Sequence, residues 1–225
     1  MIASIVPAHN EALSIAACLE SLFRASRCER LDGEPVRVIV VLDACTDATA
    51  SICRDHGADV VEVDARNVGI ARAAGAEFAL QHGARWLAFT DADSRVAPDW
   101  FAAQLALGCD AVCGTVAVDD WGEYGQRMQR HYGQSYTDAD GHHHIHGANL
   151  GVSAEAYRRV GGFRALCSSE DVDLVHSLQR EGASIAWSAA PRVITSSRSD
   201  FRAPDGFGAT LLRVDRESAV SGAGR

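Results

Sequence analysis

Residues 1–90 alternate between short apolar runs and segments with helical spacing. The apolar runs are rich in β-branched and aromatic residues, as strands buried on both faces are. The pattern predicts strands at 2–6, 36–42, 60–63 and 86–90, and helices at 11–24, 46–56 and 69–81, with Thr46 capping the second helix. A βαβαβαβ order is typical of an α/β fold with a mostly parallel central sheet and helices on both faces.

The second half of the chain is less regular. We expect strands at 110–118, 148–152, 185–187 and 193–195, helices at 154–160 and from Ser168 or Ser169 to 180, and either a helix or a loop at 121–136. No repeat or linker interrupts the pattern. The sequence therefore predicts one domain over residues 1–205, in two parts that meet near residue 118. Residues 206–225 form a C-terminal segment, whose small, polar tail from Asp215 is expected to fray.

Charge narrows the range of partners. The chain has 30 acidic against 21 basic residues, a formal charge of -9, and every basic residue is arginine. This balance argues against nucleic-acid binding and against charge-driven docking on anionic membranes. Without lysine, neither a Schiff base nor a phosphate-binding loop lysine is available.

The cysteines and the apolar runs indicate the cellular compartment in which the protein works. Seven cysteines occur without a C-x-x-C pair, which favours reduced thiols over a disulfide framework or a zinc ribbon. The first residues lack a signal-peptide pattern, and no apolar run is long enough for a transmembrane segment. We expect a cytoplasmic protein.

Acidic side chains follow the ends of three predicted strands. Glu11 comes after the first strand, Asp43 after the second, and Asp91 and Asp93 after the fourth. Ligands of parallel sheets bind beyond the carboxyl ends of the strands. Converging carboxylates repel one another unless a cation or a donor-rich ligand lies among them. The sequence therefore predicts a ligand site at this edge of the sheet.

Two pairs of acidic residues are candidates for metal binding or catalysis. Asp91 and Asp93 share one face of an extended segment, and their oxygens suit Mg²⁺ or Mn²⁺, although an isolated Asp-x-Asp is more often a solvated turn. Glu170 and Asp171 stand at a predicted helix start. They either stabilise the first helical turn through the helix dipole or include a general base, and the sequence leaves both open.

Taken in order, these segments resemble family 2 glycosyltransferases, which have the GT-A fold. The matching segments are Ile5–Glu11, Val41–Asp47, Asn67–Arg72, Phe89–Asp93, Gly147–Asn149, Gly161–Phe163 and Ser169–Leu174. Each match alone is weak, but their common order covers roughly residues 1–205. The resemblance implies a nucleotide-sugar-binding half at about 1–118 and a smaller acceptor-binding and catalytic half at about 119–205.

The resemblance also implies an activity and residue roles. It implies a metal-dependent, inverting transfer of a sugar from a nucleoside diphosphate sugar to an acceptor hydroxyl. Asp93, with Asp91, would hold Mg²⁺ or Mn²⁺, and Asp171, beside Glu170, would be the base. The donor-side residues would be Pro7, His9, Glu11, Asp43, Asn67, Arg72, Asp91, Arg198 and Arg202. The acceptor-side residues would be Trp121, His146, Gly147 and Asn149.

Three further features bear on the resemblance. The Q-x-x-R-W motif and the membrane helices of processive members are absent, so we expect a non-processive enzyme. Arg198 and Arg202 either contact the donor diphosphate or are surface arginines. The tract His142-His143-His144-Ile145-His146 is a loop beside the acceptor pocket, a solvated loop or, least expected, a metal site.

Aromatic residues near this tract also allow two interpretations. Trp121, Tyr124, Tyr132 and Tyr136 either stack on an acceptor sugar or pack among themselves. Their spacing is roughly helical, which favours packing.

Two further function classes compete with glycosyl transfer. A nucleotidyltransferase would need a glycine-rich, basic loop after the first strand, where this chain has Pro7-Ala8-His9-Asn10-Glu11. A non-catalytic nucleotide-sugar-binding protein would not need Glu170 and Asp171. A haloacid-dehalogenase-like phosphatase is disfavoured because the later lysine is missing. The base, the sugar, the acceptor and the oligomeric state stay open.

Overall fold

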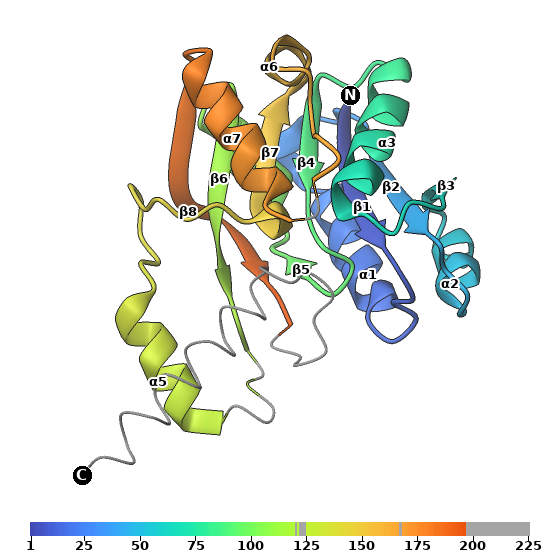
Figure 1. Cartoon of the computed structure of the whole chain (residues 1–225), viewed down its shortest axis with the longest axis horizontal. Coiled ribbons are helices and arrows are strands. Elements are labelled where there is room, and N and C mark those ends of the chain that lie inside the picture. Colours follow the sequence, from blue (N-terminus) through green and yellow to red (C-terminus); the bar gives the residue numbers. More distant parts are fainter. Residues whose placement is uncertain (120, 122–124, 167, 197–225) are drawn as a thin grey trace.

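The computed structural model describes residues 1–119, 121, 125–166 and 168–196 (Figure 1). An eight-stranded sheet forms its centre, in the order β3-β2-β1-β4-β7-β6-β8-β5. The strands are β1 Ile2–Ala8, β2 Val36–Asp43, β3 Asp59–Val63, β4 Trp86–Phe89, β5 Arg95–Val96, β6 Ala111–Ala117, β7 Leu150–Ser153 and β8 Ile185–Ile194. The predicted tail at 206–225 lies outside the described residues.

The sheet is mixed but mostly parallel, as predicted. Parallel pairing joins β3, β2, β1 and β4, and also joins β6 to β8. Strand β7 runs antiparallel to both β4 and β6, and β5 runs antiparallel to β8. Reversal of β7 brings its amino end to the edge where β4 and β6 have their carboxyl ends.

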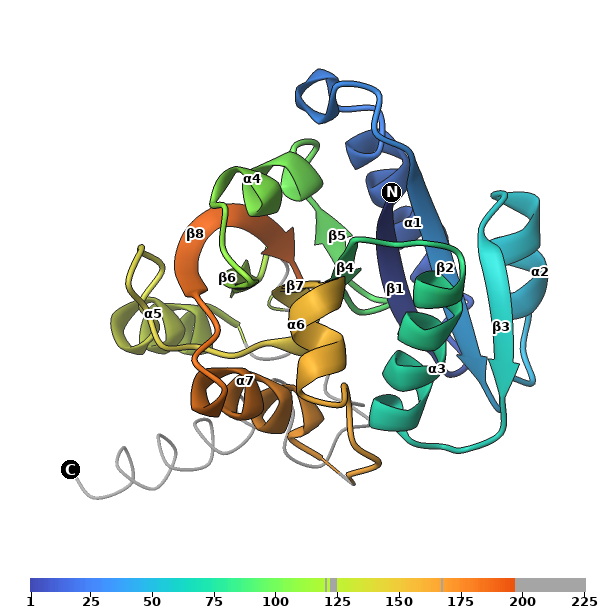
Figure 2. The same ribbon diagram turned by 90° about the horizontal axis from the view of Figure 1, so that it is seen from above.

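Helices cover both faces of the sheet (Figure 2). One face packs on α1 Ile15–Ala25, α2 Thr49–Asp55 and α4 Trp100–Ala106, and the other on α3 Val68–Gln81, α6 Ala154–Arg159 and α7 Glu170–Arg180. Alternation along the strands fills both cores, because Ile2 and Val6 belong to the first cluster while Ala3 and Ile5 belong to the second. The short helices η1 Glu29–Leu31 and η3 Gly147–Asn149 and the helix α5 Gly125–Ser135 complete the described elements.

Several predicted boundaries were wrong. Helix α1 begins at Ile15, since the amides of Ser14 and Ile15 both donate to the Glu11 carbonyl and close a turn there. Thr46 does not cap α2, because its amide is bound to the Asn10 side chain and Ala48 is the N-cap. The predicted strands 185–187 and 193–195 are one strand, β8, which curls around β6 with a shift in register. The segment predicted as helix or loop contains helix α5.

The described part of the chain contains no helix that combines the length and the apolar character needed to cross a bilayer.

Asn149 is a polar junction inside the fold. Its side chain is fully buried, and Oδ1 accepts a hydrogen bond from Trp100 Nε1 at 2.8 Å. Nδ2 donates to the carbonyls of Thr115 at 2.7 Å and Pro191 at 2.8 Å. The amide therefore joins α4, β6 and β8, and every polar atom of the side chain has a partner. This placement does not support the predicted acceptor-side role, because a fully buried side chain presents no surface to an acceptor.

Asn149→Ala should lower the free energy of unfolding by about 3 kcal/mol or more, since three buried polar groups lose their partner at about 1–3 kcal/mol each. Urea unfolding at neutral pH measures the change. Gln134→Ala, which removes an amide from the exposed side of α5, is the control and should stay within about 0.5 kcal/mol of the wild type. Equal stability of the two variants would contradict the assigned role of Asn149.

Candidate functional site

The loops after β1, β2 and β4 meet η3 and the first turn of α7 at the carboxyl edge of the sheet (Figure 1). Most of the residues predicted to be functional lie here. Among the described residues, four of the five non-glycine residues with positive φ belong to the loops of this edge: Asn10, Ala44, Arg66 and Ser169. Such backbone conformations are costly and cluster at functional sites.

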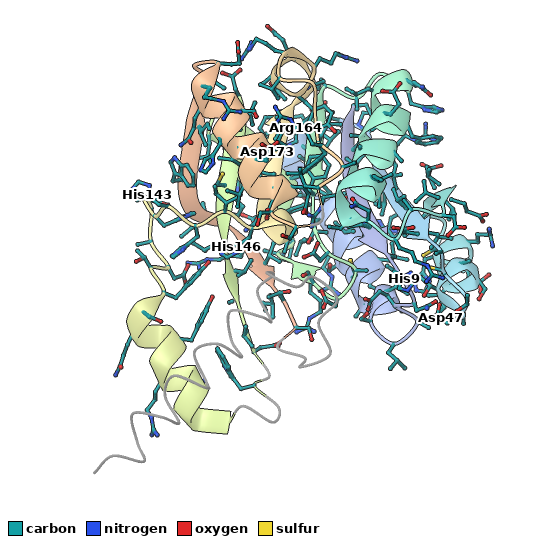
Figure 3. The ribbon with its side chains drawn as sticks, in the orientation of Figure 1. His9, Asp47, His143, His146, Arg164 and Asp173 are labelled. Atoms are coloured by element: carbon teal, nitrogen blue, oxygen red, sulfur yellow. The ribbon has the colours of Figure 1, made fainter. Side chains whose placement is uncertain are left out.

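Hydrogen bonds tie the loops after β1 and β2 together. Asn10 Oδ1 accepts the amides of Thr46 at 2.7 Å and Asp47 at 3.2 Å, and Asp47 Oδ2 accepts the Ala12 amide at 3.1 Å. His9 Nδ1 lies 2.5 Å from the Asp43 carbonyl oxygen. Figure 3 shows His9 and Asp47 together beside α2. Side-chain-to-backbone hydrogen bonds between the two loops therefore fix the loop that carries Pro7 and His9.

Asp43 shapes the loop that leads into α3. Its carboxylate is buried and accepts three backbone amides: those of Ala65 and Arg66 on Oδ1, at 2.8 and 2.7 Å, and that of Asn67 on Oδ2, at 2.7 Å. Asn67 in turn caps α3 through Ile70 N and donates to the Leu166 carbonyl at 2.7 Å. Both residues therefore organise the backbone of the site, and contact with a nucleotide stays a prediction for each.

Arg72 links two carboxylates across the site. Nη2 donates to Asp91 Oδ1 at 2.6 Å, and Nη1 is paired with Glu170 Oε1. The arginine is only 4% exposed, and its guanidinium lies over the Phe163 ring at 5.9 Å. The ion triad joins α3, the end of β4 and the start of α7. A guanidinium committed to two carboxylates is an anchor for the site rather than an open phosphate ligand.

Glycines allow this close packing. A Cβ at Gly147 would lie 2.4–2.5 Å from the Arg72 guanidinium, and a Cβ at Gly69 would lie 2.5 Å from the Arg164 carbonyl oxygen. Both distances are too short for any side chain. These two glycines, both in predicted motifs, therefore allow neighbouring chain segments to approach closely.

The two acidic residues at the start of α7 have different surroundings. Glu170 is 4% exposed, and burial raises its pKa although Arg72 opposes this effect. Asp171 is half-buried, and its Oδ2 accepts the Gly147 amide at 2.7 Å. Oδ1 accepts the Val172 amide at 2.8 Å. Asp171 is therefore the accessible carboxylate of the pair, whereas Glu170 belongs to the buried ion triad.

The donor set after β4 suits a hard divalent cation. Asp91, with a side chain 37% exposed, and the half-buried Asp93 offer carboxylate oxygens two residues apart. Within the described ranges, no three His, Cys, Asp or Glu residues converge as a closed metal site would require. Mg²⁺ and Mn²⁺ commonly take one or two carboxylates and complete their shell with phosphate and water, so these residues fit such an ion.

The histidine tract packs into an aromatic stack beside α5. Tyr132 and Tyr136 stack at 4.6 Å, and Tyr136 and His144 stack at 4.1 Å. His142 is 2% exposed and meets the Trp187 ring edge-on at 5.9 Å. At the other end, Trp121 contacts Tyr132 with a centroid distance of 5.3 Å. Of the three interpretations left open for the tract, the solvated loop is wrong for His142.

The structure brings together most of the predicted site. Asp43, Asn67, Arg72, Asp91, Gly147, Glu170 and Asp171 are connected through the contacts above. Glu11 is buried at the same edge and accepts the Ser14 hydroxyl at 2.9 Å. Trp121 is 9% exposed and lies against Tyr132. Arg198 and Arg202 lie outside the described residues.

The sequence reasoning did not identify two features of the site. One is the pairing of Arg72 with Glu170, 98 positions apart, and the other is the amide of Gly147 as a donor to Asp171. A backbone donor carries no residue-type signal. The burial of Arg72 and Glu170 could have been suspected only from the apolar residues around Arg72 in its helix.

Arg72→Leu should lower the free energy of unfolding by about 3–5 kcal/mol at neutral pH, because it leaves Glu170 buried without its cation. A raised pKa in the folded state means that the folded protein binds more protons than the unfolded one. Stability of the variant should therefore fall as the pH rises above about 4.5, the ordinary glutamate value. Urea unfolding at pH 5 and pH 8 measures this slope.

Two companion variants test the same explanation. Arg72→Leu combined with Glu170→Leu should recover part of the loss and abolish the pH slope. Arg54→Leu, which breaks the exposed pair with Glu62, should change stability by less than about 1 kcal/mol. A double variant no more stable than Arg72→Leu would refute the unpaired-charge explanation.

Solved structures share this fold at low sequence identity. TarS from S. aureus in complex with UDP-GlcNAc has a TM-score of 0.68 and 17% identity, over 96% of this chain and 65% of that one. A mannosyltransferase from Pyrobaculum calidifontis, PcManGT, with GDP-Man and Mn²⁺ has a TM-score of 0.62 and 21% identity, over 96% and 60%. GalNAc-T7 with UDP, GalNAc and Mn²⁺ has a TM-score of 0.66 and 13% identity, over 95% and 48%.

The chain thus spans less than two thirds of the length of these structures. No curated protein sequence matches it significantly. The family model described as glycosyl transferase family 2 matches residues 4–161, which is more than half of the chain and includes the ends of β1, β2 and β4. On this match, and on the GT-A architecture of its structural neighbours, the chain belongs to glycosyl transferase family 2.

Proposed function

We propose that this protein transfers a sugar from a nucleoside diphosphate sugar to an acceptor hydroxyl. The observation that carries the proposal is the joining of Asp91 and Asp171 at one site, through Arg72, Glu170 and Gly147. One carboxylate follows the central strand β4, where ligands of such sheets bind. The other begins α7 and is accessible, as a base acting on an acceptor must be.

Asp91 and Asp93 would hold the divalent cation on the donor side. When bound, Mg²⁺ or Mn²⁺ would offset the negative charge that gathers on the leaving diphosphate. Mn²⁺ is present in the PcManGT and GalNAc-T7 structures. Pro7, His9, Glu11, Asp43 and Asn67 would form the nucleotide side of the site, on the loops that the contacts above hold in place. Arg198 and Arg202 remain proposed diphosphate contacts.

Asp171 would act as the general base. The Gly147 and Val172 amides fix the positions of its two oxygens. The carboxylate would take the proton of the acceptor hydroxyl while the oxygen attacks the anomeric carbon and the diphosphate leaves from the opposite side. One displacement of this kind inverts the anomeric centre and requires no covalent intermediate on the protein.

The reaction would be non-processive and cytoplasmic. Non-processive transfer follows from the missing Q-x-x-R-W motif. Six cysteines of the described chain are free thiols, at positions 18, 28, 45, 53, 109 and 113, which agrees with a reducing compartment. His146 and Trp121 would border the acceptor, whose identity the proposal leaves open.

Asp171→Asn should abolish turnover and keep donor binding. We expect UDP-, GDP- or dTDP-sugar hydrolysis to fall by about 10²–10⁴-fold, the usual contribution of a general base. Calorimetric titration of the same donor with Mn²⁺ should give a dissociation constant within about threefold of the wild type. Asp173→Asn, which lies on the same helical turn and pairs with Arg164 at 3.4 Å (Figure 3), is the matched control and should keep activity.

Asp93→Asn should weaken donor binding itself. Because Asp93 would hold the cation that offsets the charge of the donor diphosphate, the affinity of the variant for the donor should become nearly independent of Mn²⁺ and of EDTA. A wild-type protein that binds one donor without any turnover would favour the non-catalytic nucleotide-sugar-binding alternative. Binding unaffected by the metal in both proteins would remove the proposed role of Asp93.

A further inference from the structure

The segment between α5 and β7 reaches the candidate base through one residue. His146 is the N-cap of η3, and its carbonyl accepts the Asn149 amide at 2.9 Å. The next residue, Gly147, donates its amide to Asp171 Oδ2 at 2.7 Å. Gly147 has no side chain with which to hold its own position, so its amide depends on what holds the residue before it.

The ring of His146 is held by Tyr136. His146 Nε2 lies 2.9 Å from the Tyr136 hydroxyl, and the same hydroxyl accepts the amide of Val116 from β6 at 2.9 Å. Stacking on Tyr132 and His144 fixes the plane of the Tyr136 ring. A continuous path of contacts therefore runs from β6 through Tyr136 and His146 to the Gly147 amide.

The single hydroxyl proton of Tyr136 decides which atom donates in the contact between Tyr136 and His146. A tyrosine hydroxyl has one proton, and because its oxygen accepts the Val116 amide, that proton is available to His146 Nε2. Nε2 then acts as the acceptor, which requires a neutral imidazole with its proton on Nδ1. Burial and the neighbouring histidines lower the pKa of His146 to about 3, so the ring is neutral at working pH.

We propose that Tyr136 and His146 are positioning residues that hold the Gly147 amide on Asp171. This inference rests on the proposed function of Asp171 as the base. Tyr136 touches neither Asp171 nor the reacting atoms in this arrangement; it acts by fixing His146, and His146 acts by fixing the peptide that follows it. The histidine tract would then contribute one structural hydrogen-bond acceptor to the site.

The geometry of the tract also favours this role over metal binding. His142, His144 and His146 stack ring on ring, with centroids 5.5 and 5.9 Å apart. Two of their nitrogens accept backbone amides: His142 Nδ1 accepts the His144 amide at 3.1 Å, and His144 Nε2 accepts the Thr137 amide at 3.2 Å. Rings stacked in this way do not aim three lone pairs at one point, as a metal ion requires.

Tyr136→Phe tests the proposal, because it removes the hydroxyl and keeps the stacked ring. In the full-length protein, hydrogen exchange of the Gly147 amide, followed by NMR, should become at least about tenfold faster. Donor hydrolysis should fall about tenfold in kcat, while KM for the donor stays within about twofold, since a misplaced base affects the chemical step and not donor binding.

Three further variants separate positioning from general damage. Gln134→Ala, on the exposed side of α5, is the control and should leave exchange at Gly147 and kcat near the wild type. His146→Leu should behave like Tyr136→Phe. His146→Gln should restore most of the activity, because the amide oxygen can accept the Tyr136 proton.

Hydrogen exchange at Gly147 and donor hydrolysis together distinguish the positioning role of Tyr136 and His146 from the proposed role of Asp171 as the base. Unchanged exchange at Gly147 in Tyr136→Phe, or equal acceleration in Gln134→Ala, would overturn the positioning role whatever the activity. Faster exchange at Gly147 in a protein that turns over no donor would keep the structural link and reject the assignment of Asp171 as a base. A His146→Gln variant as impaired as His146→Leu would also overturn the proposal.

Discussion

The ion triad of Asp91, Arg72 and Glu170, in which the arginine and the glutamate are buried, is the interaction on which the rest of the site depends. It ties the end of the central strand to the helix that carries Asp171, and it leaves no room for a side chain at Gly147. Burying these charges is unfavourable unless all are paired, so the triad forms only when both halves of the fold are in place. The triad therefore links α3, the end of β4 and the start of α7 at one edge of the sheet.

Around the triad, backbone amides bind the carboxylates. Asp43 accepts three amides from the loop before α3, and Asp171 accepts two. Amides cannot be protonated or displaced easily, and they hold a carboxylate with little loss of side-chain entropy. The site is thus preorganised by the chain path, at the expense of several residues in strained backbone conformations.

The sequence predicted the parallel part of the sheet well, because runs such as Val36–Leu42 are recognisable without tertiary information. Helix α4 and strand β5 were missed, since both are short and are stabilised by distant partners such as Asn149 and β8. Asp91 and Asp171 stand out in the sequence because their residue types and places suggest chemistry, and their roles stay predictions. The contacts of Asn149 could not be predicted in this way, because its three partners lie 34 to 49 positions away and a motif does not reveal them.

The reversed direction of β7 has a consequence for how this fold diversifies. The connection from β6 to β7 leaves and re-enters the sheet at the edge that carries the site, since β6 ends where β7 begins. A stretch of chain that returns to its starting edge can change in length and composition without shifting any strand. The part of this connection that is not tied to the sheet or to Asp171 can therefore vary, whereas Tyr136, Gly147 and Asn149 are fixed by hydrogen bonds to Val116, Asp171 and Pro191.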